Sequence, residues 1–205
     1  MPQTLDYLKE TASQTAGPYV HIGLAPGAAG FKLYETELGW DIAGAEAPGE
    51  RIHVEGLVID GTGAPVKDVL IEVWQADSLG IHAHPEDPRF AEVSPGFRGW
   101  GRVITDFATG LWGFDTVKPG PVPGRSGRVQ APHLNLWIVA RGINIGLATR
   151  MYFPEEADLN ASDPVLTLIE QEQRRSTLVA TREAPGRYRF DIRLQGDGET
   201  VFLDV

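Results

Sequence analysis

Cysteine is absent from the 205 residues of the sequence. Its absence excludes disulfide bonds, zinc–thiolate sites and thiol nucleophiles, and it agrees with a reducing compartment. No apolar run approaches the ~20 residues that are needed to cross a bilayer, and the N-terminal region lacks the charged and apolar segments of a signal peptide. We therefore expect a soluble protein of the cytoplasm.

Basic residues are scarce, since 18 Lys and Arg stand against 28 Asp and Glu for a net charge of −10. This balance, without any basic run, argues against a nucleic-acid or anionic-membrane partner. An anionic substrate would need a local cation. The length and the apolar fraction of 42% are those of a globular protein with one substantial core.

Residues 1–50 show little hydrophobic periodicity and are punctuated by pairs such as Gly17-Pro18 and Pro48-Gly49. An irregular segment of this length is uncommon unless it is functional or packs against another surface. Its apolar side chains favour packing over a loose terminus. These side chains are Tyr19, Val20, Ile22 and Leu24. We predict an N-terminal arm over 1–50 that packs on a partner.

Strand signals are dense from Arg51 onward. The expected strands are 53–59, 69–74, 101–106, 111–117, 133–140, 187–194 and 200–203. Only the segment from Asp163 to about Ala180 has a helical pattern, with Asp163 as a cap and Pro164 at the first helical position. Many short strands with one short helical excursion predict a mainly β protein, an antiparallel β-sandwich over residues 51–205.

The strand that begins at His133 places one imidazole and the Asn135 amide on the same face, because alternate side chains of a strand share a face. An amide is a weak ligand for a transition metal, so His133 cannot hold a metal by itself. Arg141 follows this strand and carries a guanidinium suited to a carboxylate. The alternative for Arg141 is an ordinary solvated surface arginine.

The other histidines offer one further cluster. His82 and His84, with Glu86 and Asp87, have the spacing of metal ligands. Their segment contains two prolines and no strand pattern, which favours a solvated loop.

Two histidines lie outside that cluster. We expect His53 and His21 to be structural or interface hydrogen-bonding residues rather than ligands.

Several segments resemble, in order along the chain, the intradiol ring-cleaving dioxygenases. The longest reads SQTAGPYVHIGL over 13–24. The others are 72–77, 101–102, 116–120, 131–133, 140–145, 188–192 and 198–202. In the iron-bearing subunits of this family, two tyrosines and two histidines hold ferric iron.

Three of these four ligands are missing here. Val122 follows the Lys118-Pro-Gly-Pro turn where a tyrosine would stand, Asn135 replaces the second histidine, and no tyrosine occurs between Tyr34 and Tyr152. The resemblance therefore implies vestigial ligand positions at Val122, His133 and Asn135. We expect His133 to be a satisfied, partly buried histidine.

The resemblance further implies a non-iron (alpha) subunit that pairs, in a hetero-oligomer, with a homologous beta subunit carrying Fe(III). The assembled enzyme would use O₂ to cleave protocatechuate to 3-carboxy-cis,cis-muconate. This chain would supply no catalytic residue of its own. It would supply the substrate-binding residues Thr15, Gly17, Pro18 and Arg141. Two alternatives are a non-enzymatic β-sandwich that binds a small molecule or acts as a scaffold, and a metal hydrolase or oxygenase built on His82 and His84.

Overall fold

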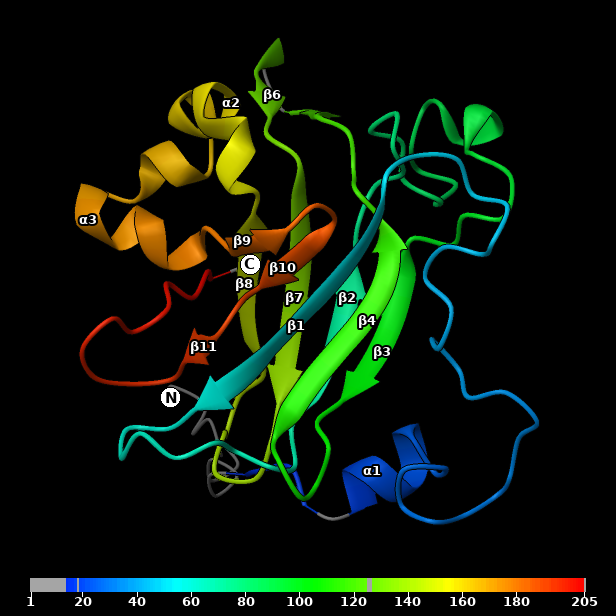
Figure 1. Cartoon of the computed structure of the whole chain (residues 1–205), viewed down its shortest axis with the longest axis vertical. Helices are drawn as coiled ribbons and strands as arrows, with labels where there is room; N and C mark the ends of the chain where they lie inside the picture. Colours follow the sequence, from blue (N-terminus) through cyan, green and yellow to red (C-terminus); the bar gives the residue numbers. More distant parts are fainter. Residues whose placement is uncertain (1–13, 18, 125–126, 205) are drawn as a thin grey trace, which may run out of the picture.

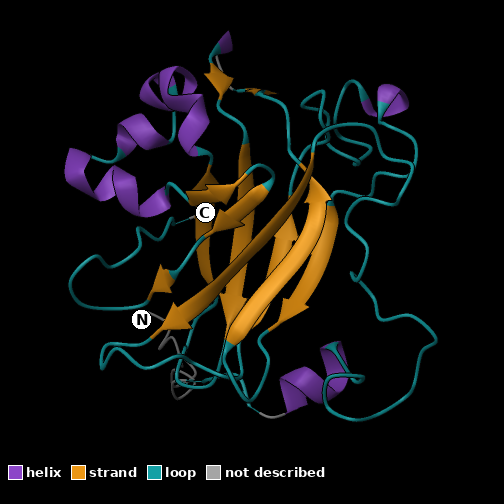
Figure 2. Cartoon of the chain, in the orientation of Figure 1, coloured by secondary structure: helices purple, strands orange, loops and turns teal. Residues whose placement is uncertain are grey.

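Two β-sheets packed face to face form the body of the protein (Figures 1 and 2). The computed structural model describes residues 14–17, 19–124 and 127–204. One sheet contains β1 (Arg51–Ile59), β4 (Leu111–Val117), β9 (Thr181–Ala184), β10 (Arg187–Arg189) and β11 (Ile192–Arg193). The other has the order β3 (Trp100–Ile104), β2 (Leu70–Trp74), β7 (His133–Val139) and β8 (Leu147–Tyr152). A short pair, β5 (Val122–Pro123) and β6 (Val129–Gln130), extends from one end.

The predicted β-sandwich is confirmed, and its core lies between the inner faces of the two sheets. Side chains such as Val54, Trp112 and Tyr188 from one sheet meet Ile71 and Leu136 from the other, and all are at most 2% exposed. The second sheet is antiparallel throughout. The first departs from the prediction, because β1 runs parallel to both β10 and β11.

The expected strand over 187–194 is interrupted at Phe190 and Asp191. Inward-facing Tyr188, Phe190 and Ile192 are buried as the alternation predicts. At the interruption the Asp191 carboxylate accepts the N–H of Leu57 at 2.9 Å, so a side chain takes the place of a ladder bond. The alternation of apolar and polar residues over 187–194 predicted which side chains face inward, but it did not predict the interruption of the strand.

A single helix over 163–180 is wrong, because this region consists of short helical pieces. They are η4 (Leu166–Leu168), α3 (Glu172–Arg175) and η5 (Ser176–Leu178). Two further pieces, η3 (Pro154–Glu156) and α2 (Ala157–Ser162), precede Asp163 and were not predicted. The carboxylate of Asp163 accepts the N–H groups of Val165 and Leu166, as a cap does, but it also accepts the N–H of Ala131 and is fully buried. Because Asp163 is buried and also bonded to Ala131, it does not begin a regular helix on the surface.

The expected strand over 200–203 is also wrong. Leu203 forms only an isolated bridge with Ala148. The segment is held instead by side chains, since Thr149 Oγ1 donates to Val201 O at 2.8 Å and Arg193 N donates to Thr200 Oγ1 at 2.9 Å.

The N-terminal segment runs along one side of the sandwich, shown in blue in Figure 1, and contains the short helix α1 (Tyr19–Leu24). A further short helix, η1 (Phe90–Glu92), lies in the loop between β2 and β3. Ile42 and Ala43 are buried against the body, and the Arg51 guanidinium donates to Ala43 O at 2.8 Å. Tyr19, by contrast, is 81% exposed. That this arm packs on a partner chain stays a prediction.

Within the described residues, no helix has both the length and the apolar character that crossing a membrane requires.

Candidate functional site

Strand β7 separates two candidate sites, because His133 begins it and Arg141 lies two residues beyond its last residue. At ~3.3 Å per residue, eight residues of extended chain place the two positions roughly 25 Å apart. In Figure 1 the arrowhead of β7 points toward the end of the sandwich at which α1 lies. The predicted substrate-binding residues and the vestigial ligand positions therefore belong to opposite ends of the molecule.

Thr15 and the loop after β7 are brought together. Thr15 Oγ1 accepts the N–H of Gly142 at 2.8 Å and lies 3.3 Å from Ile143 O, to which it can donate. These bonds attach the arm to the residues that follow Arg141. Gly17 begins the turn into α1, since Val20 N donates to its carbonyl at 3.0 Å. Pro18 lies outside the described residues.

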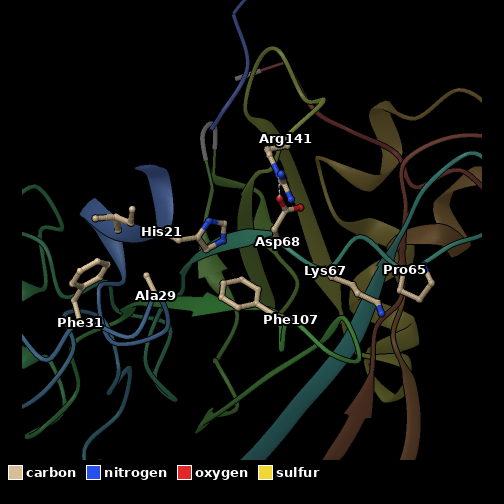
Figure 3. Close-up of a pocket in the computed structure, with 9 residues that line it drawn as sticks. His21, Ala29, Phe31, Pro65, Lys67, Asp68, Phe107 and Arg141 are labelled. Carbon is tan, nitrogen blue, oxygen red and sulfur yellow. Dashed lines mark hydrogen bonds and ion pairs between the residues drawn. The ribbon is translucent and has the colours of Figure 1, made fainter. Parts of the chain in front are cut away.

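Arg141 lines a pocket of about 630 Å³ between α1, the loop before β2 and the loop after β3 (Figure 3). Its guanidinium forms an ion pair with the Asp68 carboxylate. The side chain of Arg141 is nevertheless 63% exposed, so it keeps room for a second anion. The rings of Phe31 and Phe107 supply apolar surface on the same pocket.

His21 also reaches this pocket, and its predicted role in an interface hydrogen bond stays a prediction. Its ring is buried, meets Phe107 edge-on at 5.3 Å between centroids, and leaves Nε2 without a hydrogen-bond partner. Burial lowers the pKa of His21 and outweighs the opposing charge of Asp68. The imidazole is therefore neutral near pH 7.

At the other end of β7, His133 is buried and lies 2.7 Å from Ala131 O, to which its Nδ1 donates. Burial, reinforced by the charge of Arg150, lowers the pKa of His133 to about 4. A satisfied, partly buried histidine was expected here; its hydrogen bond to Ala131 O agrees, but the side chain is fully rather than partly buried. Asn135 Oδ1 accepts from Arg150 Nε at 2.9 Å, and Val122 is a buried apolar side chain.

These residues do not fit a ferric ion. The neighbouring phenol, Tyr152, donates to Asp163 Oδ1 at 3.1 Å, and burial raises its pKa, so it is not a tyrosinate. Over the described part of the chain, no group of three His, Cys, Asp or Glu side chains could hold a metal ion. The donor set near His133 is one imidazole, an amide whose oxygen is already engaged, and a hydrocarbon.

His82 is half-buried, whereas His84 is exposed, as expected of a solvated loop. Both rings lie against Trp74, His82 stacked at 5.8 Å and His84 edge-on at 6.0 Å. Asp87 Oδ2 accepts the N–H of His82 at 2.9 Å and so fixes the loop. Within the residues that the structure describes, these side chains form no metal-binding group, and the metalloenzyme alternative gains no support.

His53 has the predicted hydrogen-bonding role. Its Nδ1 lies 2.9 Å from Asp115 Oδ1 and its Nε2 lies 3.2 Å from Glu55 Oε2.

Sequence reasoning missed Asp68 and Arg150, which are identified only by the antiparallel register that the structure shows. Leu70 pairs with Val139, so continuing the ladder by two residues brings Asp68 opposite Arg141. Asn135 pairs directly with Arg150 on β8. Once these strands are paired, each polar residue has a defined neighbour across the sheet.

Comparisons with known proteins agree with this geometry. The family model described as "Dioxygenase" matches residues 32–196. The chain is 51% identical over 203 residues to the protocatechuate 3,4-dioxygenase alpha chain of Pseudomonas putida, covering 98% of each protein. It is 37% identical to the beta chain of the Burkholderia cepacia enzyme, over 78% of this chain and 70% of that one.

Solved structures share the fold. Hydroxyquinol 1,2-dioxygenase from Pseudomonas putida DLL-E4 superposes with a TM-score of 0.58 at 18% identity, covering 94% of this chain and 68% of that one. An intradiol ring-cleavage dioxygenase from Tetranychus urticae gives a TM-score of 0.56 at 20% identity, over 74% of this chain and 83% of that one. From its sequence and its fold together, the chain belongs to the intradiol dioxygenase family.

Proposed function

We propose that this chain is the non-iron alpha subunit of a protocatechuate 3,4-dioxygenase and acts with a homologous iron-bearing beta subunit. Support comes from the near full-length identity to an alpha chain and the more distant match to a beta chain. The donor set around His133 supports it too, because the family is one of non-haem iron enzymes and this set does not fit iron.

The observation that carries the proposal is the attachment of the arm to the loop after β7. The bonds of Thr15 with Gly142 and Ile143 hold the two predicted substrate-binding segments at one end of the sandwich. Both segments remain exposed there, and the Arg141 side chain is 63% open to solvent. Such a surface is suited to completing a site whose remaining walls belong to another chain.

The reaction we assign to the complex adds both atoms of O₂ to protocatechuate and opens the ring between its two hydroxylated carbons, giving 3-carboxy-cis,cis-muconate. Ferric iron in the beta subunit supplies the oxidative chemistry. On this chain, Arg141 offers a permanently charged, bidentate donor for an anionic group of the substrate. Thr15, Gly17 and Pro18 would shape the wall beside it.

Asp68 positions the Arg141 guanidinium in this arrangement. Their ion pair is partly solvated, so it contributes little to stability by itself. It does restrict the rotamers of a long side chain, and preorganised charge is what an anion site needs. The net charge of −10 makes such a local cation more important for attracting a carboxylated substrate.

Replacing Arg141 by alanine in the complex with the beta subunit tests this function. We expect unchanged iron content and a ten- to hundred-fold loss in kcat/KM for protocatechuate, because a charge-assisted hydrogen bond is worth about 1.5–3 kcal/mol. Arg193→Ala, an exposed arginine on β11, is the matched control and should have normal kinetics. Normal kinetics for Arg141→Ala would exclude the assigned role.

A binding module without enzymatic activity is the second candidate, because the 630 Å³ pocket at Arg141 combines a cation with aromatic walls. It predicts that the chain binds protocatechuate by calorimetry in the absence of any beta subunit. It also predicts no ring cleavage when the beta subunit is added. Activity of the mixture at a level that neither chain shows alone would decide against it.

A further inference from the structure

Arg150 lies among the vestigial ligand positions and carries a full positive charge there. It stands on β8 directly opposite Asn135, and its Nε donates to Asn135 Oδ1 at 2.9 Å. One terminal nitrogen donates to Gln130 Oε1 at 2.8 Å and to Tyr152 Oη at 3.3 Å. Three bonds to three different side chains hold the guanidinium in place.

Among the described residues, Arg150 has no carboxylate in direct contact; the Asp163 carboxylate reaches it only through Tyr152, which donates to Asp163 Oδ1 at 3.1 Å. The three acceptors of Arg150 are an amide, a second amide and a phenol, all of them neutral. In the ranges that the structure describes, no carboxylate lies within ion-pair distance of it. A guanidinium also cannot lose its proton at any pH that proteins tolerate.

The guanidinium binds one of the vestigial ligand positions directly, since its Nε donates to Asn135 Oδ1. Its charge acts on the imidazoles of both His133 and His82. His82, Val122 and Gln130 line a common pocket of about 430 Å³. Glu86 and Asp87 line it too, whereas Arg150 reaches it only through its bond to Gln130. The group that engages the Asn135 oxygen is therefore a cation placed beside the remaining imidazole.

We propose that Arg150 is a resident cation that keeps metal out of this position, so that iron is loaded by the partner subunit and not by this chain. Loss of ligands alone would leave a weak site. A fixed positive charge adds Coulomb repulsion against any metal cation, and that repulsion is strong where water is scarce. The metal exclusion stands on this chain's own contacts, whereas its consequence for the partner rests on the proposed function.

The test restores two ligands and then varies the charge. The full-length chain is made as Val122→Tyr/Asn135→His with Arg150 retained, with Arg150→Lys, and with Arg150→Gln. Each variant is exposed to Fe(II) in air, desalted, and measured for iron per chain and for the visible absorption of an iron–tyrosinate pair. We expect the variant with Arg150→Gln to bind at least five-fold more iron than the two charged variants, and only it to become coloured.

Two results would overturn the proposal: equal iron in the charged and neutral variants, or no more iron in the neutral variant than in the unaltered chain. Circular dichroism melts report folding, and Arg150→Met serves as a second neutral variant. If neither neutral variant folds, Arg150 is a structural residue and the proposal is wrong. Because iron uptake is read on this chain without a partner, the outcome is independent of whether the complex cleaves protocatechuate.

Discussion

At the scale of single residues, the buried imidazole of His133 couples the stability of the fold to pH. Its pKa is about 4 in the folded protein, against 6.5 for an ordinary histidine. Between these values the unfolded chain takes up a proton that the folded chain refuses, so stability is complete above pH 6.5 and falls as the pH is lowered toward 4. The shift corresponds to a loss of about 3 kcal/mol.

Urea unfolding at pH 7 and pH 4.5 measures this loss. Carboxylates also titrate in the range, so the comparison is with His133→Gln, which keeps a polar side chain but has no proton to gain. We expect the variant to lose about 2–3 kcal/mol less than the unaltered chain between the two pH values. Parallel losses in the two proteins would show that His133 is not the group responsible.

The site residues that could be predicted from the sequence lie in contiguous motifs, whereas those that could not are identified only by their neighbours in the folded sheet. Arg141 and Thr15 belong to contiguous segments that resemble a family, so their adjacency could be expected from the sequence alone. Asp68 and Arg150 are ordinary charged residues in sequence and acquire a role only from the residue opposite them in the sheet. Pairing across strands is set by register, which no local pattern contains.

At the scale of elements, strand β1 is the most constrained, because it pairs with β4 on one edge and with β10 and β11 on the other. Gly56 lies at the break between β10 and β11. A Cβ at Gly56 would clash with Phe190 O and lie 2.8 Å from the Trp112 ring. We expect Gly56→Ala to destabilise the fold by about 1–3 kcal/mol, measured by chemical denaturation.

Gly23→Ala is the control for this substitution. Gly23 lies in α1, and a Cβ there meets no atom within 4 Å. Alanine is favoured over glycine in a helix, so this variant should be neutral or slightly stabilised. Equal effects of the two substitutions would mean that close approach at Gly56 does not limit the packing of β1.

The elements predicted best are those whose pattern depends on local burial alone. Leu111–Val117 was predicted at its observed bounds, and the strand from His133 was predicted one residue too long, because the side chains of each alternate within one regular strand. The errors at Asp163 and Asp191 share a cause: in both, a carboxylate bonds to the backbone of a distant segment. A side chain that replaces a ladder or helix bond ends the element, and its distant partner cannot be read from neighbouring residues.

At the scale of the whole molecule, the two ends of β7 differ in how far their polar side chains are already occupied by partners within the chain. The His133 end is closed by a network of neutral acceptors around Arg150. The Arg141 end is left open, beside the arm. In this proposal the alpha subunit has lost its own iron site and supplies Arg141 to the active site of the homologous beta subunit. Such a shared site requires a permanent complex of the two chains.

The arm also carries the apolar surface that such a complex would need. Its exposed large side chains are Tyr19, Ile22, Leu24, Phe31, Leu33, Tyr34, Leu38 and Trp40. Single exposed apolar residues are normal, but a concentration of this kind along one short segment is what isolated chains avoid. A permanent interface of the ~2,000 Å² class would cover them.

Trp40 provides the sharpest test of this interface, since it is 74% exposed and tryptophan is enriched among residues that dominate binding. We expect Trp40→Ser to leave the melting temperature of the isolated chain unchanged and to weaken association with the beta subunit about thirty-fold, as a loss of about 2 kcal/mol implies. Sedimentation or calorimetric titration measures the change. Leu168→Ser is the matched control, because Leu168 is 75% exposed on the helical region far along the chain. If Leu168→Ser weakens association as much as Trp40→Ser, exposed apolar area in general is responsible and the arm has no special part; if neither has an effect, the beta subunit binds elsewhere.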